Sequence, residues 1–318
     1  MLIQILQQLS DGQFHSGEAL GQALGVSRAA VWKQLKKLDD YDIPYSSIKG
    51  KGYRLQDPIE LLDADRIEHA LQQRLDRLDI LLDVDSTNTY LMQRAADHMG
   101  QRYAVLAEKQ QHGRGRRGRQ WVSPFGKNIY LSLLMTFQGG LPALAGLSLV
   151  TAIAVERTLT RLGIAEVGLK WPNDVYLQGK KVAGILLEVT GEYQDHCQVV
   201  MGIGLNVALN ERDAASIEQP WTALRAVAPD LSRNDLAAVL LDELLLAVTT
   251  FQREGFAPLQ QQWTDADIFH EKTVRIIAPG HEKIGVVKGV NRKGELLLRT
   301  EAGMEVISAG ELSVRAVD

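Results

Sequence analysis

The N-terminal stretch repeats apolar residues at helical spacing and interrupts the repeat with turn residues. Leucine and isoleucine recur every three or four positions from 2 to 9, and Ser-Asp-Gly then ends the pattern. A second helix is predicted over 16–24, with Gly25 placed to end it and Ser27 placed to cap a third helix. Two helices joined by a tight turn that contains glycine indicate a helix-turn-helix.

The third predicted helix has one apolar and one basic face. Val31, Leu35 and Leu38 form the inward side, and the outward side begins at the helix N-terminus with small and basic residues. A recognition helix in a DNA major groove has this composition, because small residues allow close approach while arginine and lysine reach phosphates and base edges. The stretch 43–55, IPYSSIKGKGYRL, predicts a β-hairpin with lysines at its tip.

A helix-turn-helix followed by a basic hairpin is the winged pattern and predicts DNA binding. A three-helix module that binds protein, with its charged face merely solvated, is the alternative. Asp57 and Pro58 break the pattern, so the domain is expected to end at residue 62. The expected DNA contacts are Ser27, Arg28, Ala29, Trp32, Lys33, Lys36, Lys49 and Lys51.

Residues 112–121, HGRGRRGRQW, place three glycines on the G-x-G-x-x-G spacing of a dinucleotide-binding turn. That turn requires a strand before it and a helix after it. A strand is predicted over 103–109, but the following WVSPFG cannot open a long helix, and 128–137 predicts another strand. The stretch is interpreted as a glycine-loosened arginine loop suited to an anion, with a mobile basic surface loop as the alternative.

A cluster of short polar side chains follows a strand predicted over 80–84. Ser86, Thr87 and Asn88 stand where a helix begins, and they and the free N–H groups of that helix start can hold a polar ligand group. Simple capping of the helix by Ser86 is the alternative.

The rest of the central region predicts a long apolar helix over 142–162, ended by Gly163, and then a hairpin that turns at 178–180. Lys181 begins the apolar second strand of this hairpin. Its side chain is expected either to project into a lined pocket or to be solvated like that of its neighbour. The polar loop 208–220 is long enough to be functional or disordered.

Composition narrows the class of protein without fixing it. A chain of 318 residues implies two or three domains, and 45% hydrophobic with 23% charged residues is ordinary for a globular protein. The net charge of -4 means that any DNA contact must come from a local patch. The single cysteine, Cys197, excludes a disulfide framework and is expected to be a buried structural thiol. Neither a signal peptide nor an apolar run of membrane-spanning length is recognised, so a cytoplasmic protein is expected.

Seven stretches of the chain stand in an order and at spacings that closely resemble the bacterial bifunctional biotin–protein ligase and biotin-operon repressor family. They are FHSGEALGQALGVSRAAVWKQLKKL, KGKGYRL, DSTN, GRGRRGRQW, KWPNDVYL, KKVAGILLE and GIGLNV. The resemblance implies an α+β protein with a winged helix-turn-helix over 1–62, a biotin/lipoate-ligase-type α/β catalytic domain with a mixed sheet over 63–268, and an SH3-like β-barrel over 269–318. Short predicted strands with glycine turns from Thr273 onward agree with the barrel.

The resemblance also implies an activity. The biotin carboxylate is joined to the α-phosphate of ATP, with Mg²⁺ on the phosphates, and gives biotinoyl-5′-AMP and pyrophosphate. Biotin then passes to a lysine of the biotin carboxyl carrier protein of acetyl-CoA carboxylase. With the adenylate bound as corepressor, a homodimer would bind operator DNA and repress the biotin biosynthesis operon, and the carrier protein would compete for the dimer surface. No membrane is expected among the partners.

The site residues are likewise implied by resemblance. Arg116 and Lys181 neutralise charge where carboxylate and phosphate meet, and the arginine loop closes over the adenylate to exclude water. The implied biotin contacts are Ser86, Thr87, Asn88, Gln110, Arg114, Gly115, Arg116, Lys181, Gly202 and Gly204. The implied adenylate contacts are Asn206, Ile217, Trp221 and Arg315, and no metal ligand is assigned.

Two departures from the family pattern and two competing functions accompany this interpretation. Gln120 stands where relatives often carry a basic residue, and Arg212 with Asp213 makes the loop 208–220 more charged than an adenine lid needs. One competing function is that of a transcription factor that senses biotin without reacting it. Loss of Lys181 or Arg116 would favour this function, but both residues are present. The arginine loop and the winged N-terminus argue against a lipoate- or octanoyl-transferring relative.

Overall fold

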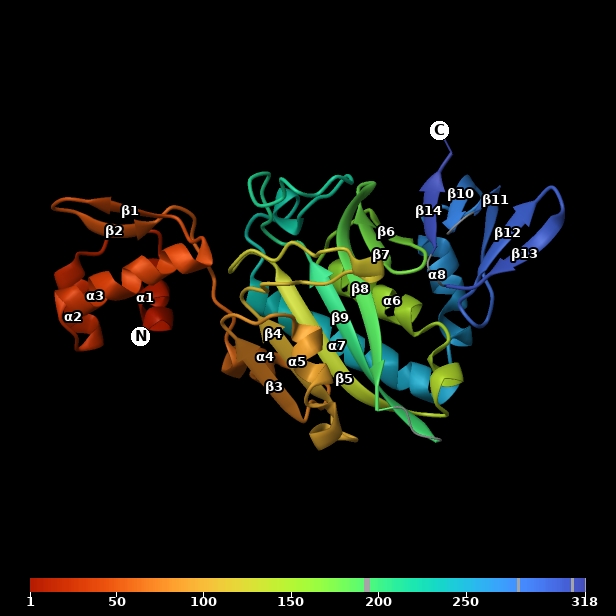
Figure 1. Cartoon of the computed structure of the whole chain (residues 1–318), viewed down its shortest axis with the longest axis horizontal. Helices are drawn as coiled ribbons and strands as arrows, with labels where there is room; N and C mark the ends of the chain where they lie inside the picture. Colours follow the sequence, from red (N-terminus) through yellow and green to blue (C-terminus); the bar gives the residue numbers. More distant parts are fainter. Residues whose placement is uncertain (192–194, 279–280, 310–311, 318) are drawn as a thin grey trace.

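The computed structural model describes residues 1–191, 195–278, 281–309 and 312–317. It has three consecutive parts (Figure 1): an N-terminal winged unit of short helices and a hairpin, a central unit built on a seven-stranded sheet, and a C-terminal unit built on a five-stranded sheet. This is the α+β architecture that was expected. The boundaries at 62 and 268 both fall between regular elements.

The winged unit has the predicted helices and hairpin. It consists of α1 (Leu2–Leu9), α2 (Gly17–Leu24), α3 (Arg28–Leu35), a 3-10 helix (Lys36–Tyr41), β1 (Tyr45–Ile48) and β2 (Gly52–Leu55), which pairs antiparallel with β1. Ser16 and Ser27 cap α2 and α3 by accepting the backbone N–H three residues on. Gly25 ends α2 in the left-handed conformation with a φ of 66°. These local signals were sufficient to place the helices.

The basic face of α3 is presented to solvent. Val31 and Leu35 are fully buried, whereas the Trp32 indole is 51% exposed and has the Lys36 ammonium 4.1 Å from its ring centroid. The remaining expected DNA contacts are exposed as well, and they are Ser27, Arg28, Ala29, Lys33, Lys49 and Lys51. The face is therefore sterically available to a nucleic acid.

The central sheet has the strand order β3-β4-β5-β9-β8-β7-β6. β3 is parallel to β4 and the other neighbours are antiparallel, so the sheet is mixed, as predicted. The strands are β3 (Arg77–Leu81), β4 (Tyr103–Ala107), β5 (Ile129–Gln138), β6 (Val167–Lys170), β7 (Asp174–Leu177), β8 (Lys180–Thr190) and β9 (His196–Leu205). The α-helices are α4 (Ala64–Ala70), α5 (Thr87–Met92), α6 (Leu147–Arg161), α7 (Arg233–Glu254) and α8 (Gln260–Ala266).

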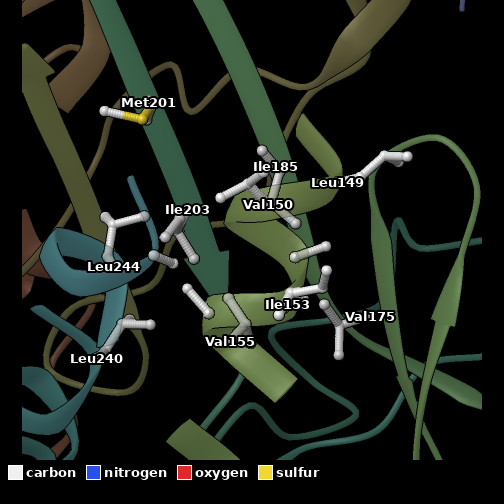
Figure 2. Close-up of a cluster of buried hydrophobic side chains, with 14 of the residues drawn as sticks. Leu149, Val150, Ile153, Val155, Val175, Ile185, Met201, Ile203, Leu240 and Leu244 are labelled. Carbon is white, nitrogen blue, oxygen red and sulfur yellow. The ribbon is translucent and has the colours of Figure 1, made fainter. Parts of the chain in front are cut away.

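Apolar residues at successive positions bury the middle strands β4, β5 and β9 on both faces over most of their length. In β4, Leu106 belongs to the large cluster with α6 and α7, while Val105 belongs to a smaller cluster with α5. Figure 2 shows Val150 of α6 and Leu244 of α7 gathered with Ile203 of β9. Cys197, also in β9, is buried as expected. A close-packed sheet covered on both sides is a rigid platform for a site.

Two predicted boundaries are wrong. The helix expected over 142–162 begins only at Leu147, because Gly146 interrupts it with a φ of 89° and backs onto Phe256, 2.8 Å from where a Cβ would lie. The strand expected over 80–84 is β3, which runs from Arg77 to Leu81.

The length and hydropathy of one apolar segment were underestimated. Residues 141–161 do reach the length and hydropathy of a membrane span, contrary to the expectation from sequence. In the fold this segment comprises a 3-10 turn (Leu141–Leu144) and α6, and Leu147, Val150 and Ile153 are fully buried. Packing within the core accounts for its apolar character.

The C-terminal unit is an antiparallel sheet in the order β13-β12-β11-β10-β14. Its strands are β10 (Thr273–Ala278), β11 (His281–Val290), β12 (Leu296–Thr300), β13 (Gly303–Ile307) and β14 (Ser313–Ala316). Val274, Val287 and Leu298 are fully buried and continue the core of the central unit through Trp263 of α8. The two units therefore share one core.

The winged unit rests on the loop that precedes β5. Phe125 of this loop is 3% exposed and belongs to the apolar cluster of the winged unit, where its ring meets Tyr41 edge-on at 5.3 Å. Gly126 has a φ of 68° and backs onto Ile59, which lies 2.6 Å from where a Cβ would stand. A side chain of the central unit thus completes the core of the winged unit.

A buried ion pair holds the connection between these two units. Arg233, at the start of α7, is 0% exposed and donates to Glu108 at 2.9 Å and to the Glu60 carbonyl at 2.5 Å. Glu108 also accepts the backbone N–H of Leu62 at 2.6 Å. Breaking such a pair leaves one buried charge uncompensated, which typically costs about 3–5 kcal/mol.

We predict that Arg233→Met lowers the free energy of unfolding by about 3 kcal/mol or more, because Glu108 is left buried and charged. The double variant Arg233→Met with Glu108→Gln should recover part of the loss, since no charge then remains buried. Urea unfolding followed by circular dichroism measures both. Equal losses in the single and double variants would contradict the role assigned to charge.

Candidate active site

A cavity of about 800 Å³ opens on the face of the central sheet that carries three glycines of paired strands. These are Gly184 in β8 and Gly202 and Gly204 in β9. A Cβ on Gly202 would lie 2.3 Å from the Asn88 side-chain oxygen, and one on Gly204 would lie 2.3 Å from the Trp121 ring. Only glycine allows these two side chains to lie directly on the sheet.

One end of the cavity is a chain of hydrogen bonds at the start of α5. The backbone N–H and the hydroxyl of Thr87 both donate to the Gln110 side-chain oxygen, at 2.9 and 3.1 Å. The Ser132 hydroxyl lies 2.8 Å from Thr87 Oγ1 and 2.5 Å from Asn88 Oδ1. Ser86 stands at the N-cap, but its side chain makes no capping hydrogen bond and lines the cavity instead. Capping is therefore not what the Ser86 hydroxyl does.

The arginine loop, which lies between β4 and β5 in the chain, borders the cavity. An antiparallel bridge joins Arg114 to Gln120, and the Gly115 N–H donates to the Arg119 carbonyl at 2.7 Å. The helical structure between the first glycine and β5 is a single 3-10 turn, Arg116–Gly118, which includes the third glycine. The rejection of a dinucleotide-binding turn is confirmed, since no helix N-terminus is available to a pyrophosphate among the described residues of this loop.

Two cations of the cavity are held by polar groups between β6 and β8. The Lys181 ammonium is 2.7 Å from Asp174 Oδ1, and these side chains are only 13% and 16% exposed. Lys181 therefore differs from the exposed Lys180 beside it and is not a solvated turn lysine. The Arg116 guanidinium donates to Asn173 Oδ1 at 3.1 Å, and burial lowers the pKa of Arg116.

A further lysine of the cavity lies at the end of β6. The Lys170 ammonium is 3.2 Å from the Tyr176 hydroxyl. Burial lowers the pKa of Lys170, the nearby Asp174 carboxylate raises it, and the Lys181 charge lowers it further. Removal from water and like charges both oppose the protonated form, so an anion bound here would be favourable for Lys170.

The cavity concentrates positive charge in a chain whose net charge is -4. Its only acidic lining residues among those described are Asp174 and Glu218. The basic ones are Arg114, Arg116, Arg117, Arg119, Lys170, Lys181 and Arg315. Seven cations against two carboxylates leave an excess of five positive charges in a partly enclosed hollow, which is an environment suited to a polyanion.

Most of the expected site residues surround this one cavity. Its lining includes Ser86, Asn88, Gln110, Arg114, Gly115, Arg116, Lys181, Gly202, Gly204, Ile217 and Arg315. Thr87 lies behind the lining and holds Gln110, and the Asn206 amide donates to the Thr222 carbonyl at 3.1 Å. Trp221 borders a second cavity, of about 1440 Å³, between the winged and central units. The ligand contacts of all these residues stay predictions.

Several residues of the cavity were missed by sequence reasoning. Lys170, Asn173 and Asp174 belong to KWPNDVYL, whose polar residues between apolar strands were a signal that no role was drawn from. The Trp121 ring covers Gly204, and its buried indole N–H has no hydrogen-bond partner among the described residues. A buried donor without a partner is costly in the folded protein, so this N–H is a group that a ligand could satisfy.

Comparison with known protein families assigns all three units. The chain matches the HTH domain family over residues 2–54, the Biotin/lipoate A/B protein ligase family over residues 82–206, and the Biotin protein ligase C terminal domain family over residues 269–315. A solved structure described as biotin protein ligase from Aquifex aeolicus in complex with biotin and ATP aligns with a TM-score of 0.66 and 28% identity, over 76% of this chain and 100% of that one.

Two full-length relatives support the same assignment. The chain is 41% identical over 314 residues to the bifunctional ligase/repressor BirA of Salmonella typhimurium, which covers 99% of this chain and 97% of the relative. It is 40% identical over 321 residues to the protein of that name from Escherichia coli K12, which covers 99% and 98% respectively. The chain belongs to the family of bifunctional biotin protein ligases and repressors.

We predict that Gly204→Ala displaces the Trp121 ring from the cavity floor, because the added Cβ would lie 2.3 Å from it. Tryptophan emission should shift to longer wavelength, and biotin should bind roughly tenfold more weakly, as expected when overpacking forces a side chain to move. Gly115→Ala is the matched control, since its Cβ would meet its nearest neighbour at 3.4 Å, and its emission should not shift. Unchanged emission and unchanged biotin affinity in Gly204→Ala would refute this account.

Proposed function

We propose that the protein is an ATP-dependent biotin–protein ligase that makes biotinoyl-5′-AMP and transfers biotin to a lysine of the biotin carboxyl carrier protein of acetyl-CoA carboxylase. The observation that carries the proposal is the cavity in which seven cations adjoin the hydrogen-bonded start of α5. A site for biotin and ATP together needs both features, because one reactant is a polar ring system with a carboxylate and the other is a polyphosphate.

In the first step a carboxylate oxygen of biotin bonds to the α-phosphorus of ATP, and the bond from phosphorus to pyrophosphate breaks. Both reactants are anions, so their repulsion must be offset by fixed positive charge. Lys181 and Arg116 are assigned this role. Asp174 and Asn173 orient them, at 2.7 and 3.1 Å, so that the cations need not reorganise during the reaction.

Mg²⁺ fits this site through one carboxylate and the phosphates of ATP. Among the described residues no group of three or more potential metal-ligating side chains is present, which argues against a cage made by the protein alone. Mg²⁺ commonly takes one or two carboxylates and completes its shell with phosphate oxygens and water. Asp174, one of the two acidic residues of the described lining, would hold the ion beside its pair with Lys181, and the ion would neutralise phosphate charge.

In the second step the lysine amine of the carrier attacks the acyl carbon, and AMP leaves with the bonding electron pair. The mixed anhydride must survive until the carrier arrives. The arginine loop protects it by covering the cavity and excluding water. We assign Ile217 and Arg315 to the adenylate end, because both line the cavity, and Asn206 and Trp221 to it by resemblance.

We further propose that the adenylate is the corepressor of a homodimer in the cytoplasm. A two-fold dimer presents two winged units to a two-fold operator, here that of the biotin biosynthesis operon. The exposed basic face of α3 and the hairpin lysines support DNA contact. The carrier protein and the second copy compete for one surface, so that unused adenylate leads to repression.

Lys181→Ala should slow adenylate formation by about 10²–10³-fold, as loss of a group that stabilises transition-state charge does. Lys180→Ala is the matched control one residue away, because Lys180 is exposed, and it should leave the rate unchanged.

The full chain is incubated with Mg-ATP and equimolar biotin and lipoate, and the recovered ligand is identified by mass spectrometry. Biotinoyl-AMP supports the proposal, lipoyl-AMP changes the substrate class, and unmodified biotin indicates a sensor without ligase chemistry.

Lys33→Ala should weaken operator binding and reduce its salt dependence by about one counterion, without slowing ligation, because Lys33 projects from the exposed face of α3. Fluorescence anisotropy with operator DNA at several salt concentrations measures both quantities. Lys293→Ala, which removes an exposed charge from the C-terminal unit, is the control. Equal affinities for the wild-type protein and Lys33→Ala at every salt concentration would remove Lys33 from the interface.

A further inference from the structure

The carboxylate of Glu188 holds two groups of the biotin end of the cavity from outside it. One oxygen, Oε2, accepts from the Asn88 amide at 2.8 Å and from the Arg114 guanidinium at 2.7 Å. Glu188 itself stands outside the described cavity lining. We propose that Glu188 is a positioning residue for ligand retention, which fixes the Asn88 amide and fastens the arginine loop to the sheet. This inference rests on the proposed function.

Glu188 determines which end of the Asn88 amide points toward it. A carboxylate only accepts hydrogen bonds, so it selects the amide nitrogen, which also donates to the Leu186 carbonyl at 3.2 Å. The amide oxygen then faces the Ser132 hydroxyl at 2.5 Å. Asn88 is only 4% exposed, so turning its amide over would leave buried groups unpaired. The ligand therefore meets a fixed pattern of donor and acceptor.

Glu188 also connects a loop to a rigid element. It lies in β8 opposite Val200 of β9, within the seven-stranded sheet, whereas Arg114 belongs to the loop and is 42% exposed. Lifting the loop from the cavity separates the ion pair. Loss of the carboxylate should therefore favour the open loop and release the ligand sooner. Lys181 lies in β8 outside the loop, and Arg116 keeps its own hydrogen bond to Asn173.

The test measures biotin dissociation from the full chain without ATP. Glu188→Ala should release biotin roughly tenfold faster, in line with loss of charge-assisted hydrogen bonds. Glu188→Gln should fall between, because its amide oxygen still accepts from Asn88. With ATP present, the KM for biotin should rise by a similar factor while kcat at saturating biotin changes less than about twofold, since the removed group acts on binding rather than on the transition state.

The matched control is Glu243→Ala. Glu243 pairs with Arg161 at 3.2 Å, with exposures of 14% and 43% that resemble the 22% and 42% of Glu188 and Arg114. It should change thermal stability about as much as Glu188→Ala and leave biotin dissociation unchanged. Arg114→Ala combined with Glu188→Ala should show less than the product of the two single effects, because the residues act together.

The outcomes separate this inference from the proposed function. If the wild-type protein fails to bind biotin, the proposed function is wrong. If it binds biotin and both Glu188 variants release it at the wild-type rate, the positioning role is wrong. The role is also wrong if the effects of Arg114→Ala and Glu188→Ala on the dissociation rate multiply in the double variant. Should Glu188→Ala not fold, the dissociation rate from Glu188→Gln decides by the same criterion.

Discussion

Mutual repulsion among the cations of one cavity is the constraint that the surrounding structure has to offset. Like charges gathered in a hollow oppose folding, and burial of Lys170 and Arg116 adds to the cost, as the lowered pKa of each indicates. The Asp174 carboxylate and the apolar packing of the sheet compensate. A bound polyanion would relieve the repulsion, so ligand binding and stability of the folded state are linked.

The sheet contributes to the site by lacking side chains at three positions. Three glycines on one face leave room for Asn88 and Trp121 to lie against the strands, while the other face is packed with apolar side chains from α6 and α7. Rigidity and close approach thus come from opposite faces of the same strands. The polar groups around the cavity are positioned on a surface that has little freedom to adjust.

Local signals explain what could be predicted from the sequence. Serine caps, Gly25 and the apolar stripes placed the helices of the winged unit, because each feature acts within one turn of helix. The break at Gly146 and the contacts of Glu188 depend on residues far along the chain. Phe256 lies more than a hundred positions from Gly146, and Arg114 lies 74 positions from Glu188. No periodicity carries such information. Resemblance therefore predicted part of the lining, whereas Lys170, Asn173 and Asp174 of the lining and the supporting contacts of Glu188 were not predicted.

The place of Phe125 bears on how separable the two activities of such a protein are. The Phe125 ring fills the core of the winged unit. The residue itself follows the arginine loop by only a few positions and belongs to the central unit. Removal of residues 1–62 would expose this aromatic ring to water. The winged unit thus covers an apolar side chain of the central unit in addition to presenting its own basic face to solvent.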